Sequence, residues 1–151
     1  MLRVALGAMA LMTIHVPAAF SADESSPAGG DVMRSGHAVY EQYCASCHGA
    51  KGEGAQNWQK RDEHGELPAP PHNAEGHTWR HSDTMLYEMI NKGLRDPFNK
   101  TQRLTMPAFE HVLSPDQIRA VIAYLKSLWT PEQRGFQEEE NRGQLLQRNK
   151  P

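Results

Sequence analysis

The stretch Cys44-Ala45-Ser46-Cys47-His48 decides the fold of this chain, and it holds both cysteines of the sequence. The spacing is Cys-x-x-Cys-His, in which two thiols lie three positions apart and an imidazole follows directly. Thiols at this spacing can reach the two vinyl groups of one porphyrin, and the adjacent imidazole can then bind the iron. The motif therefore predicts one covalently attached haem c, held by Cys44 and Cys47, with His48 as the proximal ligand of its iron.

A redox-active dithiol or a structural zinc site would also use paired cysteines. A thioredoxin-like dithiol needs a βαβ context, which the helical patterns around this motif do not supply. A zinc site needs a second pair of ligands, and His77 and His81 follow much farther along the chain than zinc-finger spacing allows. Haem attachment is the interpretation that accounts for all three residues of the motif.

Length and composition describe one globular domain. The chain has 151 residues, of which 38% are apolar and 23% charged, and its formal net charge is −2. A nucleic-acid-binding protein would carry an excess of basic residues, so nucleic acid is not an expected partner.

The first 21 residues have the pattern of a secretory signal peptide. Arg3 gives a positive start, residues 4–16 are mostly apolar, and Ala19-Phe20-Ser21 offers small residues for cleavage. An uncleaved membrane anchor is the alternative, but glycine, histidine and proline interrupt a segment already short for a span of about 20 apolar residues. We therefore expect a periplasmic protein, cleaved near Ser21, without stable membrane insertion.

The mature chain divides into a flexible lead-in at 22–30, a folded domain at 31–130 and a polar tail at 131–151. We expect a first helix from Asp31, its N-cap, with one face formed by Val32, Gly36, Val39, Tyr40 and Tyr43. An irregular segment over 49–81 follows, rich in glycine and proline. The tail is expected to be either a solvated helix or disordered, and no strand is predicted.

Two further helices have clear boundaries in the sequence. Ser82 is the expected N-cap of one, which Gly93 ends. Ser114 is the expected N-cap of the other, with Pro115 in its first turn and Gln117 completing a capping box. This last helix has a buried stripe and ends before Thr130-Pro131; its stripe consists of Ile118, Val121, Ile122, Leu125 and Trp129.

These features resemble the class I c-type cytochromes, specifically the exported monohaem cytochromes of bacteria. The resemblance covers about residues 31–129 and rests on Gly36 and Tyr40 before the attachment motif and on Tyr124, Leu125 and Leu128 in the last helix. It implies a small all-α cytochrome c fold, with three to five helices wrapped around one covalent haem and long irregular loops. It also implies that the first and last helices cross tightly at Gly36.

The resemblance further implies the remaining contacts of the haem. Met106, in the segment Met106-Pro107-Ala108-Phe109, corresponds to the distal ligand, and the Pro70 carbonyl to the acceptor of the proximal ring N–H. This chain departs from simple members by its long loop, which contains four histidines and leaves a histidine as an alternative sixth ligand. They are His64, His72, His77 and His81. The metal ligands expected are therefore His48 and Met106.

An iron with six strong ligands transfers electrons and has no open position for a substrate. We therefore expect a monomeric periplasmic electron carrier and not an enzyme, with redox proteins as its electron donor and acceptor. The alternative is a dedicated haem c subunit of a periplasmic or membrane-associated oxidoreductase complex. A sensor or peroxidase with an open iron is a third possibility.

Residues 91–103 carry a local excess of positive charge. Four basic residues lie there against Asp96 alone; they are Lys92, Arg95, Lys100 and Arg103. This segment could steer an acidic partner or neutralise haem propionates. A solvated loop with no such role is the simpler interpretation.

Overall fold

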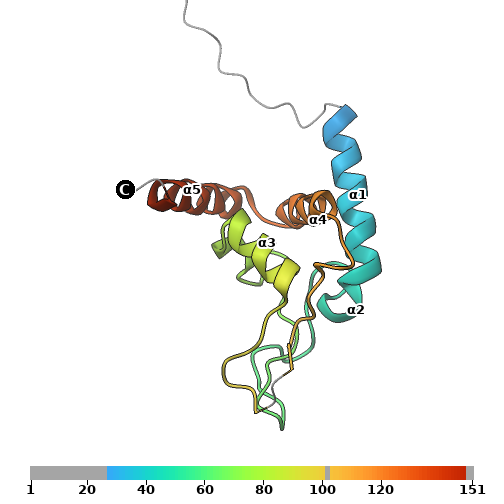
Figure 1. Cartoon of the computed structure of the whole chain (residues 1–151), viewed down its shortest axis with the longest axis vertical. Helices are drawn as coiled ribbons and strands as arrows, with labels where there is room; N and C mark the ends of the chain where they lie inside the picture. The colour runs from blue at the N-terminus through green and yellow to red at the C-terminus, as the bar shows by residue number, and fades with distance from the viewer. Residues whose placement is uncertain (1–26, 101–102, 149–151) are drawn as a thin grey trace, which may run out of the picture.

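The computed structural model describes residues 27–100 and 103–148, and these form helices joined by long loops (Figure 1). The elements in chain order are α1 (Pro27–Tyr43), α2 (Ala45–His48), the 3-10 turn η1 (Thr78–Arg80), α3 (Asp83–Lys92), α4 (Pro115–Ser127) and α5 (Pro131–Arg148). Within the described ranges, the β pairing consists of one isolated bridge, between Leu94 and Met106. The predicted all-α class is confirmed. The predicted signal peptide at 1–21 lies outside the described residues.

Helix α1 begins earlier than expected. It starts at Pro27, so Asp31 is not its N-cap but lies inside the helix and pairs with Arg34. Proline fits a first turn because its φ is fixed and that turn does not use its missing N–H. Val32, expected on the buried face, is 45% exposed, whereas Val39 and Tyr40 are buried.

The contact between α1 and α4 organises the core. A Cβ atom on Gly36 would lie 2.1 Å from the Ala120 carbonyl oxygen, so only glycine allows the two helices to approach this closely. Just beyond this point, the Tyr40 and Tyr124 rings meet with centroids 5.2 Å apart. The predicted close crossing at Gly36 is confirmed.

Helices α3 and α4 have the boundaries that their caps predict. Ser82 accepts a hydrogen bond from the Met85 N–H, and Gly93 follows the last residue of α3. Ser114 and Gln117 form the reciprocal capping box at the start of α4. All five residues of the predicted α4 stripe are buried, so these two helices are confirmed.

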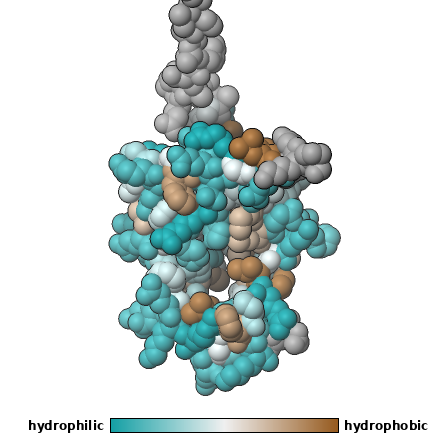
Figure 2. Space-filling view, turned by 90° about the vertical axis from the view of Figure 1, so that its left-hand side faces the viewer, coloured by the Kyte–Doolittle hydropathy of each residue, from teal (hydrophilic) through white to brown (hydrophobic). Residues whose placement is uncertain are grey.

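The C-terminal tail, expected to be either a solvated helix or disordered, forms helix α5 over Pro131–Arg148. It packs beside η1 and α3 through polar contacts: Gln137 is only 1% exposed and donates to Asp83 Oδ1 at 2.6 Å. Asn141 Oδ1 accepts from the Asp83 N–H at 2.7 Å, so α5 also caps the first turn of α3. The face on which α5 ends is mostly hydrophilic, with hydrophobic residues in separate patches (Figure 2).

Candidate haem-attachment site

One helical turn presents the attachment motif. Cys44 is the N-cap of α2, and the His48 N–H donates to the Cys44 carbonyl at 2.9 Å. Cys44 is partly buried and Cys47 exposed, and both are free thiols. Burial, and then the neighbouring Cys47, raises the pKa of Cys44 to about 11. The two sulfurs and the imidazole therefore belong to one continuous turn at the end of α1.

Tyr40 supports the backbone on the far side of this turn. Its side chain is fully buried, and its hydroxyl donates to the Gly49 carbonyl at 2.8 Å. Burial is the largest cause that raises the pKa of Tyr40, so the hydroxyl stays protonated and remains a donor. The helix crossing at Gly36 is thereby connected to the residue that follows His48.

The Pro70 carbonyl lies beside the His48 ring. The distance from His48 Nδ1 to the Pro70 oxygen is 2.8 Å, and a carbonyl can only accept, so Nδ1 carries the proton. The neutral ring then has its lone pair on Nε2, which is the form that binds a metal. Burial lowers the pKa of His48, although the bond to Pro70 opposes that shift.

The four loop histidines do not form a group. His72 stacks on His48, with ring centroids 3.8 Å apart, so it lies beside the imidazole that would bind the iron. His77 lies against His81 at 5.5 Å, and His64 is next to the carboxylate of Glu63. No cluster of three or more His, Cys, Asp or Glu side chains that could hold a metal ion occurs in the described part of the chain.

Met106 lies in a segment that contacts Leu94 at one end and Tyr43 at the other. Its N–H donates to the Leu94 carbonyl at 2.9 Å, and its carbonyl accepts from the Leu94 N–H at 3.0 Å. Three residues later, the Phe109 ring meets the Tyr43 ring edge to face, with centroids 6.2 Å apart. Since Tyr43 directly precedes Cys44, the methionine segment reaches the attachment turn.

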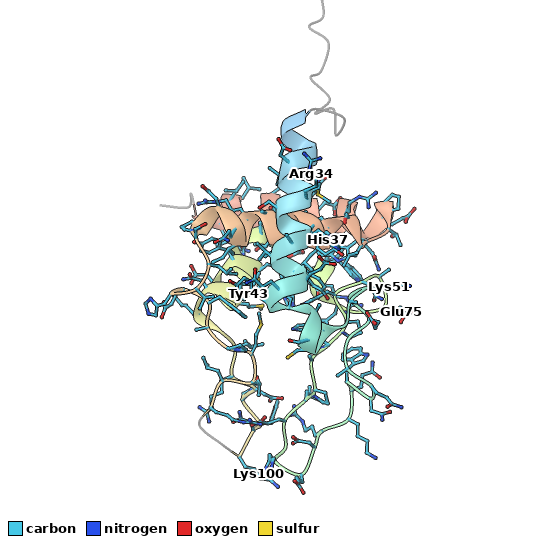
Figure 3. All side chains as sticks on the ribbon, turned by 90° about the vertical axis from the view of Figure 1, so that its right-hand side faces the viewer. Arg34, His37, Tyr43, Lys51, Glu75 and Lys100 are labelled. Carbon is cyan, nitrogen blue, oxygen red and sulfur yellow. The ribbon has the colours of Figure 1, made fainter. Side chains whose placement is uncertain are left out.

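The two long loops are joined at their far end. The Arg103 guanidinium bonds Glu66 through Nε and NH2, and Arg61 lies 2.6 Å from Asp96. Lys100, at the tip in Figure 3, donates its backbone N–H to His64.

Two of the four basic residues over 91–103 pair with a carboxylate, and Asp96, the acid that opposes them in this segment, pairs with Arg61. Lys92 pairs with Glu88 at 2.8 Å, and the Lys100 ammonium donates to the Glu63 carbonyl. Pairing weakens the field of Lys92 and Arg103, and the steering of an acidic partner by this segment stays a prediction.

The donor set fits a c-type haem. Two free thiols can add across two vinyl groups, the His48 ring has its Nε2 lone pair, and the Met106 thioether is a soft ligand suited to iron. Partly exposed leucines occur on both loops, as the apolar faces of a macrocycle require: Leu67, Leu94 and Leu104.

Comparison with known proteins supports a c-type haem. A family model described as "Cytochrome C oxidase, cbb3-type, subunit III" matches residues 31–125. The chain belongs to this cytochrome c family. The matched range contains the attachment motif, Pro70 and Met106, and the protein carries covalently bound haem c and transfers electrons.

The chain spans less than a third of the length of the curated relative that it matches. The chain is 28% identical over 97 residues to the Cbb3-type cytochrome c oxidase subunit FixP of Sinorhizobium medicae (strain WSM419). The aligned region is 64% of this chain and 30% of the relative. No solved structure matches. None of the helices in the described ranges is long and apolar enough to cross a membrane.

Sequence reasoning missed three features of the site. It did not find the stack of His72 on His48, the Tyr40 contact with Gly49, or the docking of α5. The first joins residues 24 positions apart inside an irregular loop, where no periodicity indicates which side chains meet. The third depends on buried amides in a segment that reads as solvated.

Proposed function

We propose that this cytochrome is an exported, monomeric one-electron carrier of the periplasm, with its iron held by His48 and Met106. The N-terminal pattern of a signal peptide supports export. Bound haem c supplies the one-electron iron couple, and no residue of the chain needs to act as acid, base or nucleophile.

The contact between His48 Nδ1 and the Pro70 carbonyl, at 2.8 Å, is the observation that carries the proposal. It fixes the tautomer, orients the ring and makes Nε2 a stronger donor, as outer contacts of a metal-bound histidine do. A proline carbonyl is well suited to this role because the restricted backbone limits its movement.

Met106 supports the second half of the proposal. Its backbone N–H and carbonyl both pair with Leu94, so its position is fixed against the residue that lies two positions after the end of α3. A neutral thioether favours Fe(II) over Fe(III), which implies a potential above that of a bis-histidine haem. Redox proteins are the partners that such a couple requires.

A dedicated subunit of an oxidoreductase complex is the second candidate. The similarity to an oxidase subunit of Sinorhizobium medicae favours it. Size-exclusion chromatography of a native extract separates the two: a free carrier elutes at its mature monomer mass, and a subunit elutes with its complex.

The experiment that tests the proposal is haem staining after denaturing electrophoresis of periplasmic and membrane fractions. We expect one stained band in the periplasmic fraction at the mature mass. A stained band confined to membranes would contradict the carrier, and an unstained mature band from cells competent in cytochrome c maturation would contradict haem attachment itself.

A further inference from the structure

His72 lies flat against the His48 ring. Their centroids are 3.8 Å apart and their planes differ by 23°. The edge of the His48 ring is already occupied at Nδ1 by the Pro70 carbonyl. The His48 imidazole is therefore held at its edge by a hydrogen bond and at one face by a second ring.

The His72 ring is itself held by a chain of hydrogen bonds. The Thr78 hydroxyl donates to the Pro71 carbonyl at 3.3 Å, so its oxygen is free to accept from His72 Nδ1 at 2.9 Å. Thr78 is buried and starts η1. The backbone of His72 is fixed as well, because its carbonyl accepts from Trp129 Nε1 at 2.8 Å.

A third ring lies next to His72. Tyr40 meets it edge to face, with centroids 6.3 Å apart, and Tyr40 is completely buried. Rotation of the His48 ring about its Cβ–Cγ bond would press into His72, which has Tyr40 and Thr78 around it and little room to move.

We propose that His72 is a positioning residue that sets the rotational orientation of the proximal imidazole, an inference that rests on the proposed role of His48. The plane of an axial imidazole fixes the direction in which its π orbitals overlap those of the iron. In the ferric protein this direction, together with the orientation of the Met106 thioether, would govern how unpaired spin is distributed over the four haem methyl groups. His72 thus acts on the haem through His48, without binding the iron.

The test is the proton NMR spectrum of ferric holoprotein, in which the four haem methyl signals are resolved by their paramagnetic shifts. His72→Phe keeps a flat ring against His48, whereas His72→Leu fills similar volume without one. We expect His72→Phe to retain the wild-type order and spacing of the four signals, and His72→Leu to change them. His77→Leu is the matched control, since His77 contacts Trp58 and His81 and should leave the spectrum unchanged.

An unchanged spectrum in His72→Leu would overturn the inference. His72→Val provides a second route if His72→Leu yields too little holoprotein: it too removes the flat ring that lies against His48, and an unchanged spectrum there would count equally against the inference. Failure of the proposed function would look different, because a wild-type spectrum without the signals of a low-spin haem would show that the iron lacks the two strong ligands proposed for it.

Discussion

At the scale of single residues, Met106 has the clearest consequence for chemistry. Its thioether is the soft neutral ligand of the proposed site, and its backbone is anchored to Leu94. Among the described methionines outside this loop, Met33 lies in α1, and Met85 and Met89 lie in α3. If one of these helical methionines bound the iron, the haem would have to be oriented differently. The proposed distal ligand is therefore Met106.

Met106→Ala removes the proposed distal ligand. We expect the reduced variant to bind carbon monoxide and its reduction potential to fall, because the ligand that favours Fe(II) is gone. Met85→Ala is the control, since Met85 is 37% exposed on α3 and should leave both properties unchanged. If Met106→Ala keeps the wild-type potential and spectra, the ligand is another residue, and the loop histidines are the next to test.

His81 predicts a pH dependence of stability. Burial lowers its pKa, its neighbour His77 lowers it further, and Glu140 opposes the shift. As the pH falls below about 6.5, the unfolded chain takes up a proton at this position before the folded chain does, so the fold loses stability. His81→Gln should therefore lose less thermal stability than wild type between about pH 7.5 and about pH 5.5. Equal losses in the two proteins would contradict the assignment.

Several site residues could be read from the sequence because a local motif or a family pattern marks them. Cys44, Cys47 and His48 are contiguous, and the Pro70 contact agrees with what the resemblance implies. The family resemblance also implies Met106 as the distal ligand, and this role stays a prediction. His72 was considered only as an iron ligand, because sequence spacing cannot show that its ring lies against His48.

At the scale of elements, α4 supplies the centre of the core. Leu125 is 3% exposed and belongs to the cluster that joins α1, α3 and α4. Leu125→Ala should cost about 2–5 kcal/mol of the free energy of unfolding, as large-to-small core changes do. Val112→Ala is the control at 53% exposure, and its cost should stay within about 0.5 kcal/mol. Denaturant titration measures both, and similar losses would show that the α4 stripe is not a packed core.

The end of α3 sets the position of the methionine loop. Gly93 has φ +73°, and a Cβ atom there would lie 2.6 Å from the Met106 carbonyl oxygen. Gly93→Ala should therefore cost about 1–3 kcal/mol and weaken methionine ligation, seen as a reduced far-red absorption band of the ferric protein. Gly135→Ala in α5 is the control of opposite sign: a Cβ atom there would meet no other part of the described chain within 4 Å, so alanine should stabilise by about 0.5–1 kcal/mol. A Gly93→Ala variant with wild-type stability and an unchanged band would contradict this role.

The helices that the sequence predicted well are those with explicit caps. Ser82, Ser114 and Gln117 marked α3 and α4 because a cap is a local interaction that needs no tertiary contact. The start of α1 was misplaced, since Asp31 is a good cap in isolation but the helix continues back to Pro27. The packing of α5 could not be foreseen, because it rests on the buried amide of Gln137 and not on an apolar stripe.

At the scale of the whole molecule, the helices and the long loops have different roles. The α1 and α4 crossing holds the attachment turn, and the two loops that leave α2 and α3 are joined at their far end by Arg103 and Glu66 (Figure 1). The haem is the large flat group around which such irregular segments can wrap, and covalent attachment keeps it in place during redox cycling.

The response of the reduced wild-type protein to carbon monoxide at neutral pH tests the central claim most directly. An electron carrier with His48 and Met106 on its iron has no open position. The absorption spectrum of the reduced holoprotein should therefore be that of a low-spin, six-coordinate haem, and it should not change when carbon monoxide is added. Rapid formation of a carbon monoxide complex, or a high-spin spectrum before the gas is added, would contradict the account.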